Sequence, residues 1–170
     1  VIQPPEIRHR VLFASDNIEV IEIGVPAEHV TTIDHDMELP TPNFMPERKF
    51  SGQKFVHSEV LDADWAQSRL PGFMSRDTTI CKNTQGVASV HLIKRGDGIP
   101  LWTSHTSDIH FNFVLEGGFT LEGVGQPAQE LKSGDAFVIP PKMKVRYAHP
   151  SDDLELLEVS LPGDFKTQVD

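Results

Sequence analysis

The stretch HTSDIHFNFVLEGGFTLEG at residues 105–123, followed by GDAFVIPPKMKVRY at residues 134–147, decides the fold of this chain. Short apolar runs alternate here with Glu-Gly-Gly, Gly-Gln-Pro, Ser-Gly-Asp and Pro-Pro-Lys, which are turn signals between strands. The same spacing continues on both sides, so we expect strands at residues 87–95, 110–115, 119–124, 129–132, 136–140, 145–149 and 154–161. Many short strands of this kind predict an all-β sandwich or barrel. Residues 62–67 predict a short helical turn ahead of them.

The strand at residues 110–115 carries more information than its neighbours. Side chains alternate between the two faces of a strand, which separates Phe111, Phe113 and Leu115 from His110, Asn112 and Val114. Two interpretations remain open. Either the phenylalanine face packs on protein while the polar face lines a pocket, or the phenylalanines face the core while His110 and Asn112 face water.

Composition narrows the classes of partner. The formal net charge is −10 and the sequence pI is about 5.2, which argues against nucleic acids and anionic membranes. The single cysteine, Cys81, excludes an internal disulfide framework and a cysteine-based zinc site. No apolar run is long enough to span a bilayer, and no signal peptide is evident. We therefore expect a soluble, cytoplasmic protein.

Two segments at opposite ends of the chain repeat one another. Residues 4–34 and residues 140–170 align without a gap at an offset of 136. Their ten identities are Pro4/Pro140, Pro5/Pro141, Arg10/Arg146, Ser15/Ser151, Asp16/Asp152, Glu19/Glu155, Glu22/Glu158, Pro26/Pro162, Thr31/Thr167 and Asp34/Asp170. A repeat spaced at domain size indicates a duplicated domain.

The repeat suggests a division of the chain into three parts. We expect residues 1–34 to be the tail of a first copy, residues 35–54 a proline-containing linker, and residues 55–170 a complete second copy. A complete first copy would require roughly another hundred residues upstream, by the repeat offset. Since a lone hairpin is only marginally stable in water, residues 10–25 are expected to pair with the second barrel or to cover it.

Together these segments resemble the cupin superfamily, the small RmlC-like jelly-roll barrels also described as double-stranded β-helices. The resemblance covers residues 87–162, and the repeat extends it to residues 2–26. Cupins carry a first motif of His-x-His, four residues and Glu, and a second motif of Gly-Asp, an apolar strand and Pro-x-Gly-x-x-His. In that family three histidines and one glutamate hold Fe, Mn, Ni, Cu or Zn at the barrel mouth, a donor set that suits such metals.

The family's four ligand positions fall on Thr103, His105, His110 and Val145 of this chain. His105 keeps the expected residue, His110 replaces the glutamate, and Val145 cannot ligate a metal. His149 lies four residues after Val145 and could compensate, which would give a His105/His110/His149 site. The alternative is that the metal was lost and that these histidines line a pocket or bind to the backbone.

The first copy keeps its closing motif better. The stretch PPEIRH at residues 4–9 places His9 at the last histidine of the second motif, with Glu6 in place of the glycine. The resemblance therefore makes His9 the best single metal-ligand candidate of the chain. Its partners are expected upstream of residue 1.

The predicted pocket consists of Trp102, Thr103, His105, His110, Asn112, Val145, Tyr147 and His149. Trp102 and Tyr147 offer aromatic surface for stacking a small organic ligand. Tyr147 beside His110 could also act as an acid/base pair without a metal. No residue is assigned a catalytic role.

Two classes of function follow. In the first, the second barrel is a degenerate, metal-poor module that binds a small organic molecule or serves in dimerisation. In the second, the chain is part of a metal-dependent bicupin enzyme, such as a dioxygenase, decarboxylase or isomerase, with Fe, Mn, Ni or Zn as its cofactor. In either class we expect a homodimer.

Overall fold

The computed structural model describes residues 1–60 and 64–170, and it is nearly all β, as predicted. Its elements within these residues are β1 (Lys49–Phe50), β2 (Gln53–Lys54), β3 (Ala66–Gln67), β4 (Phe73–Asp77), α1 (Ile80–Asn83), β5 (Ser89–Arg95), β6 (Thr103–His105), β7 (Ile109–Glu116), β8 (Gly118–Gly123), β9 (Gln129–Lys132), β10 (Ala136–Val138), β11 (Val145–Ala148), β12 (Glu155–Leu161) and β13 (Thr167–Val169).

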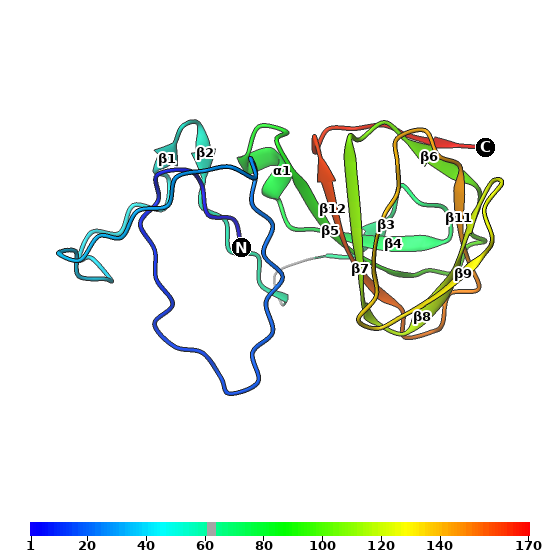
Figure 1. Cartoon of the computed structure of the whole chain (residues 1–170), viewed down its shortest axis with the longest axis horizontal. Coiled ribbons are helices and arrows are strands. Elements are labelled where there is room, and N and C mark those ends of the chain that lie inside the picture. Colours follow the sequence, from blue (N-terminus) through cyan, green and yellow to red (C-terminus); the bar gives the residue numbers. More distant parts are fainter. Residues whose placement is uncertain (61–63) are drawn as a thin grey trace.

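Two antiparallel sheets fold together into a barrel (Figure 1). The six-stranded sheet has the order β10-β7-β12-β5-β4-β3, and the five-stranded sheet has the order β13-β6-β11-β8-β9. Strands far apart in sequence are neighbours in both sheets, with β12 lying between β5 and β7. The β1–β2 hairpin forms a separate two-stranded sheet.

The interior of the barrel is polar at one end and apolar at the other. Along β7 and β12 the inward-facing pairs are His110 with Ser160, Asn112 with Glu158, and Val114 with Leu156. All six side chains are buried. The apolar end continues into a core formed by Leu70, Phe73, Ile93, Val114, Phe119, Ile139, Val145, Tyr147, Leu154 and Leu156. One end of the barrel is therefore stabilised by apolar packing and the other depends on paired polar groups.

This burial decides between the two interpretations of the strand at residues 110–115. His110 and Asn112 face the interior and are 1% exposed, so the interpretation that places them in water is wrong. Phe111 and Phe113 lie on the outer face and are half-buried. A buried face that is polar at its first two positions requires internal partners for those groups.

The sequence placed seven strands, and each occurs within two residues of its expected bounds. The strands β1, β2, β3, β4, β6 and β13 are not expected from the sequence, since each is short or lacks clear alternation. The helical turn expected at residues 62–67 is wrong where it can be judged, because Ala66–Gln67 belongs to β3. Residues 62–63 of that turn lie outside the described residues.

The expectation that residues 10–25 pair with the barrel or cover it is also wrong. These residues form no strand, and every one of them is exposed (Figure 1). Their twins in β11 and β12 form strands because β5, β6, β7 and β8 supply hydrogen-bonding neighbours. In the described part of this chain no free strand offers residues 10–25 the same pairing, so their alternating pattern alone does not produce a sheet.

The contacts of residues 1–48 are few. Ile2 forms an isolated bridge with Val56, and Arg10 donates a hydrogen bond to the carbonyl oxygen of Leu39. The division into a repeat tail, a linker and a barrel remains a prediction. None of the helices in residues 1–60 and 64–170 is long and apolar enough to cross a membrane.

Candidate functional site

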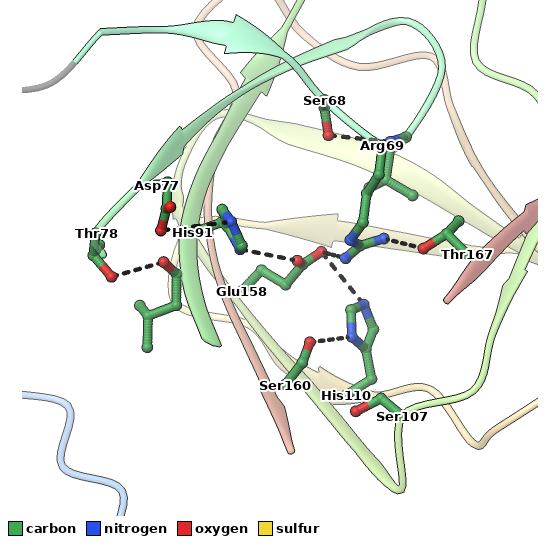
Figure 2. Close-up of polar contacts among 12 residues, drawn as sticks. Ser68, Arg69, Asp77, Thr78, His91, Ser107, His110, Glu158, Ser160 and Thr167 are labelled. Atoms are coloured by element: carbon green, nitrogen blue, oxygen red, sulfur yellow. Dashed lines mark hydrogen bonds and ion pairs between the residues drawn. The ribbon is translucent and has the colours of Figure 1, made fainter. Parts of the chain in front are cut away.

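A buried carboxylate organises the polar end of the barrel. Glu158, on the central strand β12, is fully buried and forms an ion pair with Arg69 from the β3–β4 turn. Its oxygens also lie 3.4 Å from Nε2 of His110 on β7 and 3.9 Å from Nδ1 of His91 on β5. Figure 2 shows Glu158 between His91 on one side and Arg69 with His110 on the other. Three strands and one turn therefore meet at a single side chain.

The pKa of Glu158 reflects this arrangement. Burial alone would raise it, but the positive charge of Arg69, followed by the hydrogen bond and charge of His110, lowers the pKa to about 2. Glu158 is consequently an anion at neutral pH. A buried anion of this kind is tolerated only while its cationic partner stays in place.

The same network fixes the orientation of His110. Its Nε2 faces the Glu158 carboxylate, while its Nδ1 lies 2.9 Å from Oγ of Ser160. Arg69 is fixed in turn, because its Nη1 donates a hydrogen bond of 3.0 Å to Oγ1 of Thr167 on β13. Both nitrogens of the His110 ring are therefore engaged within the protein.

His105 stands next to this network but outside it. Its ring lies 4.4 Å from the His110 ring, centroid to centroid, and it is 5% exposed. Its Nε2 lies 3.1 Å from the carbonyl oxygen of Ile139, and since a carbonyl only accepts, Nε2 carries the proton. Nδ1 is then a bare acceptor, and within the described residues it has no hydrogen-bond partner.

Burial, followed by the neighbouring His110, lowers the pKa of His105 to about 4. The ring is therefore neutral at physiological pH. A buried neutral imidazole with a free nitrogen can accept a hydrogen bond from a ligand, or a proton.

Tyr147 on β11 supplies the complementary donor. Its ring stacks on Phe119, with centroids 5.1 Å apart, and packs edge-on against Phe73. Its hydroxyl is buried and has no partner among the residues that the structure describes. Burial, and after it the charge of Glu158, raises the pKa of Tyr147, so the phenol stays protonated.

These side chains line one small cavity of about 10 Å³, with room for about one water molecule. Its walls include Arg69, Thr103, His105, His110, Val145 and Tyr147. Five of the eight predicted pocket residues are thus brought together. The sequence did not point to Arg69, whose contribution depends on a contact with a strand 89 residues later.

The remaining predicted residues lie elsewhere. Asn112 is buried beside Glu158 in the sheet but does not line the cavity. Trp102 lies against the Arg146 guanidinium, 5.3 Å from ring to cation, while Arg146 pairs with Glu122. His149 is exposed, has a positive φ of 52° and follows the end of β11. His9 is exposed in the N-terminal segment.

These residues do not fit the metal site that the family resemblance implies. Thr103 and Val145 are register partners on neighbouring strands. Val145 has no atom that can ligate a metal, and Thr103 offers only a neutral hydroxyl where the family has a histidine. Glu158 is already paired with Arg69. Within residues 1–60 and 64–170, no group of three or more His, Cys, Asp or Glu side chains is arranged to hold a metal ion, which includes the proposed His105/His110/His149 group.

Comparison with known proteins defines the class of fold. Residues 89–160 match the family described as Cupin domain, somewhat less than half of the chain. No curated protein matches the chain in sequence.

Solved structures agree. A cupin-like protein from Thermotoga maritima superimposes with a TM-score of 0.52 and 19% identity, over 66% of this chain and 90% of its own. The polyketide cyclase RemF from Streptomyces resistomycificus superimposes with a TM-score of 0.50 and 18% identity, over 63% of this chain and 79% of the cyclase. Salicylate 1,2-dioxygenase from Pseudoaminobacter salicylatoxidans superimposes with a TM-score of 0.50 and 15% identity, over 62% of this chain but only 31% of the dioxygenase. The barrel is a cupin jelly roll, as expected, and identities this low establish the fold alone.

Replacing Glu158 by glutamine should destabilise the protein by about 3–5 kcal/mol, because Arg69 would be left without its anionic partner. Denaturant unfolding at pH 7 measures this loss. Glu155→Gln, on the same strand but half-exposed, is the matched control and should change the unfolding free energy by less than about 1 kcal/mol. Equal effects of the two substitutions would contradict the role given to Glu158.

Stability should also fall on acidification. In the unfolded chain His105 gains a proton near pH 6.5, but in the folded protein it does so only near pH 4. The free energy of unfolding should therefore fall by roughly 3 kcal/mol as the pH drops through that window. Glu158 adds a further loss between about pH 4.5 and 2, since its folded pKa is the lower one. Urea unfolding from pH 7.5 to 4 tests the first part. In His105→Gln the decline of the unfolding free energy between pH 6.5 and 4 should flatten. Parallel curves of unfolding free energy against pH for the variant and the parent protein would contradict the role given to His105.

Proposed function

We propose that the barrel at residues 55–170 is a metal-poor module that binds a small, neutral organic molecule at its polar end. The observation that carries the proposal is that two buried groups of residues lining the cavity, Nδ1 of His105 and the hydroxyl of Tyr147, have no hydrogen-bond partner within the described residues. One accepts and the other donates a hydrogen bond. Buried polar groups normally have partners, and a ligand hydroxyl could satisfy both.

The charge of the site supports a neutral ligand. Arg69 is a cation in the cavity wall, but Glu158 already neutralises it, so an anionic ligand would compete with a buried ion pair. His105 is neutral at physiological pH. In this proposal His105 accepts a hydrogen bond from a bound hydroxyl and Tyr147 donates one to it, which describes a binding site without a resident metal in this barrel.

An NMR titration of the full chain with glycerol, cyclohexanol and phenol tests the proposal. We expect at least one of these compounds to shift the His105 ring signals. Tyr147→Phe, which removes only the hydroxyl, should weaken that binding roughly tenfold. The proposal fails when no compound of the panel shifts His105, or when the variant binds as tightly as the parent protein.

A second candidate is that the chain is part of a metal-dependent bicupin enzyme. The internal repeat and the position of His9 in the closing motif favour it. The repeat also includes the key acid, since Glu22 is the twin of Glu158. In this candidate the metal belongs to a first barrel completed by residues upstream, with His9 as one ligand.

Metal analysis separates the two candidates. A longer protein that contains the upstream sequence should carry stoichiometric metal and should lose it in His9→Ala, while His105→Ala keeps it. Metal that is lost in His105→Ala but kept in His9→Ala would place the metal in the second barrel and would contradict both candidates as written. The cytoplasmic location and the homodimer remain predictions of the sequence, and sedimentation equilibrium measures the latter.

A further inference from the structure

The ring of Phe165 covers the polar end of the barrel. It lies in the segment between β12 and β13, with its centroid 4.6 Å from the Arg69 guanidinium carbon. It also meets the His105 ring at 6.1 Å and 86°, and the His110 ring at 5.6 Å and 60°. One planar ring is thus held against a cation and two imidazoles.

Polar contacts of the two residues that follow Phe165 hold this ring in place. The backbone N–H of Thr106 donates to the carbonyl oxygen of Lys166, and Oγ1 of Thr106 accepts from the N–H of Lys166. Directly after them, Thr167 receives the hydrogen bond from Arg69. Residues 163–167 therefore form a strap across the barrel, with Phe165 as the side chain beneath it.

One residue of the strap, Thr167, lines the cavity, and Phe165 packs on the Arg69, His105 and His110 side chains that form part of its wall. A cavity of about 10 Å³ admits about one water molecule, whereas sites for organic ligands usually measure roughly 300–1,000 Å³. Yet His105 Nδ1 and the Tyr147 hydroxyl remain without partners in this cavity, as far as the described residues go. Phe165 packs against three side chains of the cavity wall but has no polar atom to satisfy either group.

The surroundings of Phe165 indicate which molecule would replace it. A guanidinium beside a ring favours a planar π system, through cation–π attraction. The bare Nδ1 of His105 calls for a hydroxyl donor, and the Tyr147 hydroxyl for an acceptor. The paired Arg69 leaves little attraction for an anion.

We propose that Phe165 occupies the ring position of the ligand, and that the site binds a neutral hydroxylated aromatic ring of the phenol class when the strap at residues 163–167 moves aside. The inference rests on the proposed function. It adds the chemical class of the ligand and the segment, residues 163–167, that has to move for the ligand to enter. Phe165 is half-buried and not part of the main apolar core, so its displacement leaves that core intact.

The test compares phenol, benzene and cyclohexanol as probes, titrated into the full chain and into Phe165→Ala by NMR. Phenol should bind Phe165→Ala roughly tenfold or more tightly than it binds the parent protein, which has to displace its own ring. In the variant, phenol should also bind more tightly than both other probes. Lys166→Ala, an exposed neighbour on the same strap, is the matched control and should behave like the parent.

The two other probes distinguish the possible failures. A plain apolar void would prefer benzene, since the phenol hydroxyl would be buried without partners, and that order overturns the inference. Equal binding of phenol and cyclohexanol overturns the aromatic class but leaves the proposed function standing. Binding of neither hydroxyl compound to Phe165→Ala overturns both.

A second variant guards against misfolding. Thermal unfolding reports whether Phe165→Ala folds. Should it not, Phe165→Leu keeps apolar cover but removes the ring, and it should still bind phenol more tightly than the parent protein does. Unchanged phenol binding in Phe165→Leu would then overturn the inference.

Discussion

The ion pair between Glu158 and Arg69 is the interaction on which the polar end of the barrel depends. A carboxylate with no exposed surface, on the central strand of a six-stranded sheet, is stable only with a cation beside it. Arg69 reaches it from the β3–β4 turn, ahead of the residues that match the cupin family. The same guanidinium holds Thr167 and lies against Phe165, so one charge pair positions both the wall and the cover of the site.

The pair also determines what chemistry remains available. Glu158 is engaged by Arg69, and His110 by Glu158 and Ser160, so neither is free to bind a ligand directly. Two of the four ligand positions that the cupin resemblance implies hold Thr103 and Val145, which pair with each other across β6 and β11. Among the described residues that line the cavity, the buried atoms with neither a hydrogen-bond nor an ion-pair partner are then a neutral acceptor on His105 and a neutral donor on Tyr147. A site of this composition suits hydrogen bonding to an uncharged molecule.

Local sequence patterns were sufficient for seven of the thirteen strands in the described residues and for part of the site. The strand at residues 129–132 was placed residue for residue, and the alternation in β7 separated His110 from its phenylalanine neighbours. Glu158 was missed because, within the run LELLEVSL, it looks like an ordinary polar residue of an amphipathic strand. Its identity with Glu22 in the repeat was the available signal. Propensity also failed for residues 10–25, where the alternating pattern is present but a pairing partner is not found in the described chain.

The protonation state of His105 tests the central claim most directly. Nitrogen-15 NMR of the histidine side chains at pH 7 distinguishes protonated from bare ring nitrogens. The structure predicts a neutral His105 with its proton on Nε2, donated to Ile139, and an unprotonated Nδ1 that persists until the pH approaches about 4. A proton on Nδ1 at pH 7, or a charged ring near pH 6, would contradict the account.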